Sequence, residues 1–365
     1  MYTSTYKFIN ETELSYAREV SNSFSPSINN IGASVIATGG NEKINFLAGI
    51  SEKLRLFNPN VSFTDRLNDQ ISSREFGDPS SVIESSAFFS AGMLLMNMMH
   101  LDAGLRFTTA FTDEASFYIP EPRFRIALWD GKSVSPHINY IRLSQLDHSV
   151  EGSNAGLRNI LWLPVYKDFG PEISDIVSAG IQGKIKNDFV WTIDCYYKSI
   201  AGMIDFKPGA SFIFDTTFTD MIDRTKGISY GLETGVIKRT GKLTGTFSYT
   251  WSRSKREWNS PEGMIWIPSN ADRPHSVNLS LKYYCTNKTS FGLNWVYQSG
   301  APATIYMHET SYGEWFETKN NIRYLDYHRL DLSYRQIIYK KKFSILLDID
   351  VYNVYNRKNT FYFKK

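Results

Sequence analysis

Two pairs of neighbouring side chains in this sequence could do acid–base chemistry, namely Asp147 with His148 and Asp326 with His328. A catalytic triad is recognised by its geometry in space, however, and closeness in the chain does not supply that geometry. The 6 histidines include no His-x-x-x-His pair of the kind that ligates zinc. Cys195 and Cys285 are too few for a disulfide framework or a metal site. We therefore expect no enzyme activity, no cofactor and no metal.

Aromatic side chains gather in two polar segments between predicted strands, and these are candidates for binding. The candidate contacts are Trp258, Met264 and Trp266 in the first segment, and Tyr306, His308, Tyr312, Trp315 and Phe316 in the second. Aromatic side chains offer a large contact area together with a polar handle, which suits a ligand site on external loops. The alternative is that they pack one loop against another.

Charged side chains also recur with a period of two in the last part of the chain. They are Arg329, Asp331, Arg335, Asp348 and Asp350. Successive side chains of a strand point to opposite faces, so these five share one face of two neighbouring strands. We expect them to contact one another, or whatever fills the interior that they face.

The stretch from 343 to 356 indicates that the candidate residues above are positioned by β-strands. Its apolar side chains Phe343, Ile345, Leu347, Ile349 and Val351 alternate with polar ones, with Leu346 as the exception. Such a strand is apolar on one side and charged on the other. A wall between lipid and a wet interior explains this pattern best.

The same pattern predicts about fifteen strands and no helix with an apolar stripe. The predicted strands cover 6–18, 31–38, 44–57, 82–95, 100–111, 118–129, 134–146, 177–186, 189–204, 228–239, 243–255, 275–285, 290–299, 327–339 and 343–356. Short turns at 187–188, 240–242, 286–288 and 340–342 alternate with long loops, such as 147–176, 256–274 and 300–324. Outer-membrane barrels show this asymmetry. We therefore predict an all-β, antiparallel transmembrane β-barrel.

Composition excludes two other classes of protein. The most apolar run, 87–99, is too short to cross a membrane as a helix and is interrupted by Ser90 and Asn97, and the mean hydropathy is −0.31. The 40 basic and 37 acidic residues are spread along the chain without a basic patch, so we expect no nucleic-acid partner. The first residues lack a basic start followed by an apolar core, so no signal peptide is predicted.

From about Glu121 onward, the chain resembles the C-terminal barrel region of TonB-dependent outer-membrane receptors, in particular those of Bacteroidetes. The matching segments keep the order and spacing of that family. They are Glu121–Arg123 (EPR), Tyr196–Lys198 (YYK), Ser229–Glu233 (SYGLE), Ser248–Ser254 (SYTWSRS), Asp272–His275 (DRPH), Tyr297–Pro302 (YQSGAP), Tyr327–Ser333 (YHRLDLS) and Asn353–Asn359 (NVYNRKN).

The resemblance implies a protein of the Gram-negative outer membrane that imports a scarce ligand, such as a metal chelate, vitamin, glycan or peptide. Its partners would be outer-membrane lipid, a small ligand and the TonB–ExbB–ExbD system. Barrels of this class have about 22 strands around a plugged lumen. Residues 1–365 would then form one partial barrel without plug or closing strand, and the five charges in the last two strands would face the plug. A passive porin or a barrel-based surface adhesin is the alternative, and a soluble carbohydrate-binding β protein is a more distant one.

The direction in which the last strand crosses the membrane leads to the same expectation of an incomplete barrel. If the turn at 340–342 lies on the periplasmic side, the last strand runs outward and no later strand returns to close the barrel. An open edge in a bilayer leaves backbone groups unsatisfied, each at a cost of several kcal/mol. We therefore expect the barrel to lack at least one strand after 356.

Overall fold

The computed structural model describes residues 2–9, 17–24, 27–58, 61–67, 70–76, 79–129, 133–152, 159–185, 188–207, 221–260, 262–304, 308–310, 313–315, 318–340 and 343–360. Every named element within these ranges is a β-strand. No helix in the described residues is long and apolar enough to cross a membrane.

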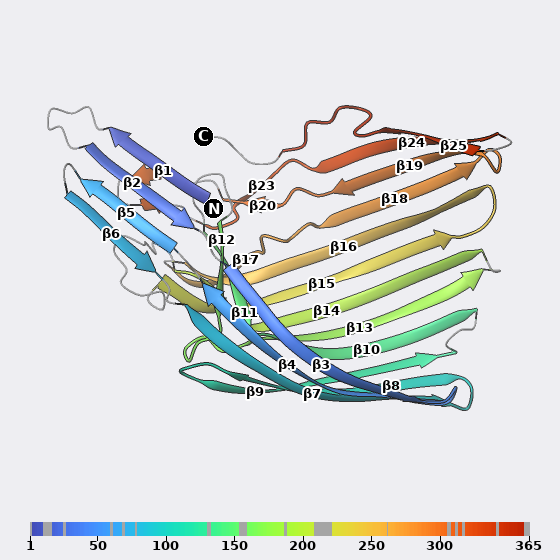
Figure 1. Cartoon of the computed structure of the whole chain (residues 1–365), viewed down its shortest axis with the longest axis horizontal. Helices are drawn as coiled ribbons and strands as arrows, with labels where there is room; N and C mark the ends of the chain where they lie inside the picture. Colours follow the sequence, from blue (N-terminus) through green and yellow to red (C-terminus); the bar gives the residue numbers. More distant parts are fainter. Residues whose placement is uncertain are drawn as a thin grey trace.

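Fifteen of the strands form one antiparallel sheet, which confirms the predicted all-β barrel fold. Their order is β25-β24-β19-β18-β16-β15-β14-β13-β10-β9-β8-β7-β4-β3, with β17 paired to β16 beside this path. The bounds are β3 (Ser27–Gly40), β4 (Ile44–Asn58), β7 (Ser80–Leu95), β8 (Met99–Phe111), β9 (Ser116–Leu128), β10 (Val134–Gln145), β13 (Glu172–Ile185), β14 (Phe189–Phe206), β15 (Ile222–Lys238), β16 (Leu243–Ser260), β17 (Gly263–Pro268), β18 (His275–Tyr284), β19 (Thr289–Gln298), β24 (Tyr327–Lys340) and β25 (Phe343–Val351). The sheet curls around a hollow, with β3 and β25 on opposite margins (Figure 1).

The remaining strands form four small sheets. Strands β1 (Tyr2–Ile9), β2 (Ala17–Phe24), β5 (Val61–Leu67) and β6 (Gln70–Phe76) make a four-stranded sheet of their own. The other three are hairpins or short pairs: β11 (Asp147–Gly152) with β12 (Asn159–Pro164), β20 (Pro302–Ala303) with β23 (Ile322–Arg323), and β21 (His308–Thr310) with β22 (Gly313–Trp315).

The two ends of the curved sheet differ in their connections. We call the end with connections 41–43, 96–98, 239–242 and 285–288 the turn end, and the opposite end the loop end. Turn chemistry fits the turn end, because Gly40 and Gly241 have φ values of 124° and 91°, which favour glycine. The loop end carries most of the small sheets (Figure 1).

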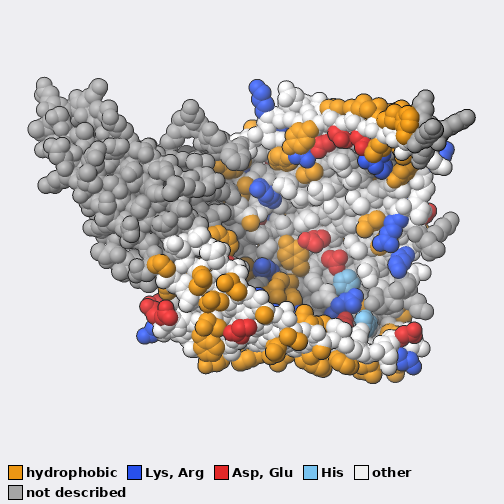
Figure 2. Space-filling view, viewed as in Figure 1, with side chains coloured by type: hydrophobic (Ala, Val, Ile, Leu, Met, Phe, Trp, Pro, Cys, Tyr) orange, Lys and Arg blue, Asp and Glu red, His pale blue; other side chains and the backbone are white. Residues whose placement is uncertain are grey.

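Side-chain alternation separates two faces of the wall. Four apolar side chains on adjacent strands are cross-strand neighbours in one row: Phe247, Leu279, Trp295 and Leu330. The next row, one residue along each strand, is polar and contains Thr246, Ser280, Asn294 and Asp331. Figure 2 shows hydrophobic side chains along the outer margins of the wall and charged ones on the hollow face between them. The predicted two-faced strands are therefore present.

Several predicted boundaries are wrong. A strand at 6–18 is contradicted, because β1 ends at Ile9, β2 begins at Ala17, and 10–16 lie outside the described residues. The segments 58–81, 147–176 and 256–274, interpreted as connections, contain β5 and β6, β11 and β12, and β17. These strands are short, and they lie in small sheets or, in the case of β17, pair only with the end of β16, so no long apolar alternation marks them. The β8–β9 connection, 112–115, is short although it lies at the loop end.

The last strand is shorter than predicted. Strand β25 ends at Val351, and Asn353 and Asn356 follow with φ values of 53° and 51°. The Asn353 side chain accepts from the Arg357 backbone N–H at 3.0 Å and donates to the Arg357 carbonyl at 3.1 Å. Asparagine tolerates this left-handed conformation, so a turn replaces the last part of the predicted strand. Within the described residues, β3 and β25 each have a strand on one side only.

The two-faced wall predicts opposite effects at adjacent positions of β18. Leu279→Arg would place a charge on the lipid-facing row and should destabilise the protein by about 2–4 kcal/mol in a bilayer. Ser280→Arg, one residue away on the hollow face, should change stability little. Chemical unfolding of both variants in lipid vesicles measures the difference, and equal losses would contradict the assignment of the faces.

Candidate functional site

A hairpin from the loop end folds over the hollow face and is the first part of the candidate site. Its strand β11 lies against β14, while β12 lies against β4 and β7. In the sheet order, β7 and β14 are separated by β8, β9, β10 and β13, so the hairpin bridges these strands. It therefore narrows the hollow at the loop end.

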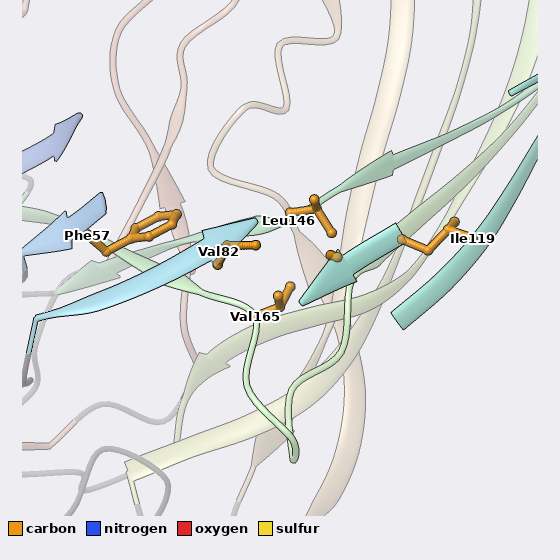
Figure 3. Packing of buried hydrophobic residues seen from close by; sticks show 6 residues of the cluster. Phe57, Val82, Ile119, Leu146 and Val165 are labelled. Carbon is orange, nitrogen blue, oxygen red and sulfur yellow. The ribbon is translucent and has the colours of Figure 1, made fainter. Parts of the chain in front are cut away.

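A small apolar cluster holds the base of this hairpin. Its buried members are Phe57, Val82, Ala110, Ile119, Leu146 and Val165, each 5% exposed or less. Leu146 directly precedes β11 and Val165 directly follows β12, whereas the other four come from β4, β7, β8 and β9 (Figure 3). The backbone N–H of Val165 also donates to the Leu146 carbonyl at 3.2 Å. The cluster thus ties both ends of the hairpin to the wall.

Polar contacts fix the first two residues of β11. The Arg55 guanidinium of β4 lies 2.9 Å from the Asp147 carboxylate. His148 is fully buried, and its ring nitrogens lie 3.1 Å from the Glu172 carboxylate and 3.1 Å from the Gly170 carbonyl. Asp147 and His148 therefore anchor the hairpin, because each contacts residues outside it.

Glu84 is the centre of the charges beneath the hairpin. Glu84 is 4% exposed, and its carboxylate lies within 3.3 Å of side-chain nitrogens of Lys53, Arg55 and Arg106. Arg55 thus bridges Glu84 in the wall and Asp147 in the hairpin. Buried charges persist when they are paired and hydrogen-bonded, and this network meets that condition.

The β16–β17 hairpin forms the second part of the candidate site, and its alternation sorts the predicted aromatic residues. Trp258 is 2% exposed and shares its face with buried Ile267, whereas Met264 and Trp266 on the other face are 50% and 46% exposed. The three predicted contacts therefore lie on paired strands and are not equivalent. Met264 and Trp266 are accessible to a ligand, while Trp258 packs inside.

A buried ion cluster supports this second hairpin. Asp205 at the end of β14 is 2% exposed and accepts from Lys319 Nζ at 2.8 and 2.9 Å. Arg256, on the buried face of β16, lies 3.3 Å from the same carboxylate. Next to Lys319, the Asn320 amide donates to the Pro268 carbonyl at 2.7 Å. The segment 318–320 therefore fastens β17 to the barrel wall.

Asp272 makes a similar connection a few residues further along. Its side chain accepts from the Ser254 backbone N–H at 2.7 Å and forms an ion pair with Arg323 of β23. Arg323 also donates to the Gly300 carbonyl at 3.1 Å. Sequence reasoning missed Asp205, Lys319, Asp272 and Arg323 as a set, since Lys319 and Asp205 are 114 positions apart and no motif joins them.

The second group of predicted contacts is only partly described. Tyr306, Tyr312 and Phe316 lie outside the described residues. His308 and Trp315 are cross-strand partners in the β21–β22 pair. The backbone thus brings these two positions together, and their ligand contact stays a prediction.

The predicted charges of the last two strands share the hollow face, and four of the five form ion pairs with one another. Arg335 donates to the Asp348 carboxylate at 2.6 and 3.2 Å, and Arg329 donates to Asp331 at 2.9 Å. Asp350 lies opposite Ser333 in the register. A contact between these charges and a plug stays a prediction.

The second acid–base pair and one serine motif have non-catalytic partners as well. Tyr297 and the Gly300 N–H donate to Asp326, and His328 Nδ1 lies 2.8 Å from the Tyr355 hydroxyl. The segment Gly227–Gly231 (GISYG) also matches the Gly-x-Ser-x-Gly motif, which sequence reasoning missed. A nucleophilic serine of this motif sits on a strand-to-helix turn, but this segment lies inside β15. Ser229 Oγ lies 2.8 Å from Ser254 Oγ. The described residues also contain no group of three or more His, Cys, Asp or Glu that could hold a metal ion.

The chain shares its fold with solved metal transporters and with a receptor of a bacterial outer membrane. It matches the FrpB iron transporter of Neisseria meningitidis (F3-3 variant) with a TM-score of 0.65 and 12% identity, over 99% of this chain and 58% of that one. It matches the copper transporter OprC with a TM-score of 0.62 and 12% identity, over 96% and 53% of the two chains. For the ferripyoverdine receptor of the Pseudomonas aeruginosa outer membrane, the TM-score is 0.61 and the identity 11%, over 93% and 46%.

The chain therefore spans about half the length of the solved structures that it matches. These neighbours are transporters and a receptor. No protein-family model matches the sequence. A search of curated proteins found no match either.

The buried ion cluster predicts a large loss of stability when one partner is removed. Asp205→Asn leaves Lys319 and Arg256 buried without their counter-charge and should lower the free energy of unfolding by about 3–5 kcal/mol. Asp102→Asn is the matched control, because Asp102 and its partner Arg125 are 39% and 35% exposed. That change should cost about 1 kcal/mol or less. Denaturant unfolding in detergent compares them, and equal losses would contradict the role of the cluster.

Asp326, in the connection before β24, offers a test by pH. The Tyr297 hydroxyl and then the Gly300 N–H stabilise its carboxylate and lower the pKa of Asp326. Its contribution to loop stability is therefore present above the unfolded pKa of about 3.9 and is lost as pH falls through the folded value. Tyr297→Phe should raise the pKa of Asp326, measured by NMR titration. A wild-type pKa at or above about 3.9 would contradict these contacts.

Proposed function

We propose that this chain forms part of the barrel wall of a TonB-dependent receptor that imports a scarce ligand across the Gram-negative outer membrane. The observation that carries the proposal is the curved, fifteen-stranded sheet, which matches iron and copper transporters over nearly all of this chain. The resemblance of segments such as Asp272–His275 and Tyr327–Ser333 to this family supports it independently.

The loop end supports a role in ligand recognition. Two hairpins lie there, one folded over the hollow and one presenting Met264 and Trp266, and both are fixed by buried contacts. A rigid support lowers the entropic cost of binding. We therefore place the ligand surface at the loop end, with Trp266 as an anchor and with His308, Trp315, Tyr306 and Tyr312 as further candidates.

The proposal gives the hollow face and the open edges a role in the whole protein. Arg329, Asp331, Arg335, Asp348 and Asp350 would face a plug, through which the TonB–ExbB–ExbD system supplies energy. Because an unpaired edge is costly in hydrocarbon, further strands would cover β3 and β25. A passive porin or a barrel-based surface adhesin is the second candidate, supported by the same curved wall.

An uptake experiment separates these candidates. In the bacterium that encodes the chain, deletion of its gene should lower the accumulation of one probe from a panel of ferric chelates, a copper chelate and cobalamin by about ten-fold or more. Collapse of the proton-motive force should cause the same loss, because TonB-dependent import uses that energy. Unchanged accumulation of every probe, together with free passage of sugars through reconstituted vesicles, would support the porin instead.

A pair of tryptophans then tests the ligand surface with the responsive probe. Trp266→Ala should weaken binding by about ten-fold or more with unchanged stability, because exposed aromatic anchors contribute about 2 kcal/mol. Trp258→Ala should instead destabilise the protein by about 3–5 kcal/mol, because its side chain is buried. Wild-type binding by the Trp266 variant would exclude this residue from the site.

A further inference from the structure

Cations gather on one part of the turn end, and the import proposed above does not explain them. The connection between β15 and β16 carries Arg239 and Lys242, and the connection between β18 and β19 carries Lys288. All three side chains are exposed. Lys238, the last residue of β15, is half-buried beside them. We call Lys238, Arg239, Lys242 and Lys288 the basic rim.

The opposite part of the turn end lacks this excess of positive charge. The connection 41–43 holds Glu42 and Lys43, whose charges cancel, and the connection 96–98 holds no charged residue. Among the described residues of the turn-end connections from β13 to β19, Asp188 is the only acidic one. The four cations of the basic rim therefore outnumber the acids beside them.

Backbone hydrogen bonds fix the turns of the basic rim in one row. The Arg239 N–H donates to the Asp188 carbonyl at 3.0 Å, which ties this turn to the start of β14. The N–H of Tyr284, the last residue of β18, donates to the Lys242 carbonyl at 2.7 Å. Because neighbouring strands lie about 4.8 Å apart, cations on successive hairpins start about 10 Å from one another.

Lys238 shows how one of these cations is held toward the outer face. Val236, two positions earlier, is the cross-strand partner of outward-facing Phe247, so Lys238 points outward as well. Its ammonium lies 5.3 Å from the centre of the Phe189 ring and donates to the Thr240 carbonyl at 2.6 Å. An ammonium group carries three donors, so this one has donors left for a ligand.

The basic rim adjoins an aromatic margin of the outer face. Leu243, which directly follows Lys242, begins an outward row of successive cross-strand neighbours that continues with Tyr283, Phe291 and Tyr334. Aromatic girdles border the apolar band of outer-membrane barrels, and their short turns are periplasmic. In a wall that spans the outer membrane, the basic rim therefore lies at the level of the head groups of the periplasmic leaflet, which consists of phospholipids.

The chemistry of the basic rim fits an anionic head group. Ammonium and guanidinium groups donate hydrogen bonds and accept none, and they pair strongly with phosphate oxygens. Clusters of about four or more Lys and Arg beside a membrane attract lipids with a net negative charge. Phosphatidylglycerol carries such a charge, whereas zwitterionic phosphatidylethanolamine does not. Because the rim adjoins the outward apolar row, a membrane lipid fits it better than a soluble polyanion.

We propose that the basic rim binds the phosphate of an anionic phospholipid in the periplasmic leaflet. The phosphate lies among Lys238, Arg239 and Lys242, and Lys288 extends the row of cations toward β19. The acyl chains lie along the outward row that begins at Leu243. This lipid site is at the opposite end of the wall from the ligand surface, so it does not depend on the import proposed above.

Competitive lipid binding tests this site. The full chain in detergent micelles is mixed with equal amounts of phosphatidylglycerol and phosphatidylethanolamine of identical acyl chains, and native mass spectrometry counts the retained lipids. Wild type should retain phosphatidylglycerol about ten-fold better, because several cations face its net negative charge. The triple variant Arg239→Gln, Lys242→Gln and Lys288→Gln should abolish this preference.

A matched variant controls for the loss of charge. Arg224→Gln, Lys226→Gln and Lys255→Gln together remove three exposed cations from the loop-end parts of β15 and β16, and this triple variant should keep the preference. Equal retention of the two lipids by wild type, a preference that persists in the glutamine variant of the basic rim, or an equal loss in the control would overturn the proposal.

Two further measurements identify the interaction and the bound molecule. The preference should weaken as ionic strength rises, because salt screens exposed charges, and a preference independent of salt would overturn the proposal. A benzophenone side chain in place of Asn287, which is exposed beside Lys288, should cross-link to phospholipid in the native membrane. A cross-link to protein, peptidoglycan or lipopolysaccharide in its place would also overturn it.

Discussion

Backbone hydrogen bonding is the constraint on which the rest of this structure depends. A peptide group that faces hydrocarbon finds no water, so its N–H and C=O must pair with a neighbouring strand. The ladders from β3 to β25 provide this pairing and send side chains alternately to the outer face and to the hollow face. The apolar row through Phe247 and Leu279 and the polar row through Thr246 and Ser280 both follow from it. The same constraint makes the outer edges of β3 and β25 positions where further strands are expected.

The polar side chains of the wall lie on its hollow face, and they determine which contacts hold the hairpins at the loop end. Its supports are mostly charges: Glu84 with Arg55 beneath one hairpin, and Asp205 with Lys319 beneath the other. Only a small apolar cluster around Val82 and Leu146 adds to them. A buried pair is costly to break, so the hairpins are held in defined positions. A binding surface on such supports would be pre-organised, with exposed side chains such as Trp266 available to a ligand.

The sequence was sufficient for the wall and insufficient for the site, for physical reasons. Period-two alternation marks strands such as β16 strongly, because one face of the wall is apolar and the other polar. It also places Arg335 and Asp348 on a common face. It does not mark β5, β6 or β11, which are short and belong to small sheets apart from the wall. Trp258 and Trp266 looked equivalent in one polar segment, and only the β16–β17 pairing shows that they lie on opposite faces. Asp205 and Lys319 come together only in the folded structure, so no local sequence pattern predicts this pair.

The most direct test of this account is a spin-label scan along β16. After Cys195 and Cys285 are replaced by serine, single labels at positions 245 to 251 are exposed to oxygen, which partitions into lipid, and to a polar nickel chelate. The account predicts that oxygen accessibility peaks at 245, 247, 249 and 251 and that nickel accessibility peaks at 246, 248 and 250. Two opposite oscillations of period two would show a wall between lipid and water. Equal accessibility of both faces to the nickel chelate would contradict a lipid-facing wall and would indicate a sheet that is wet on both sides.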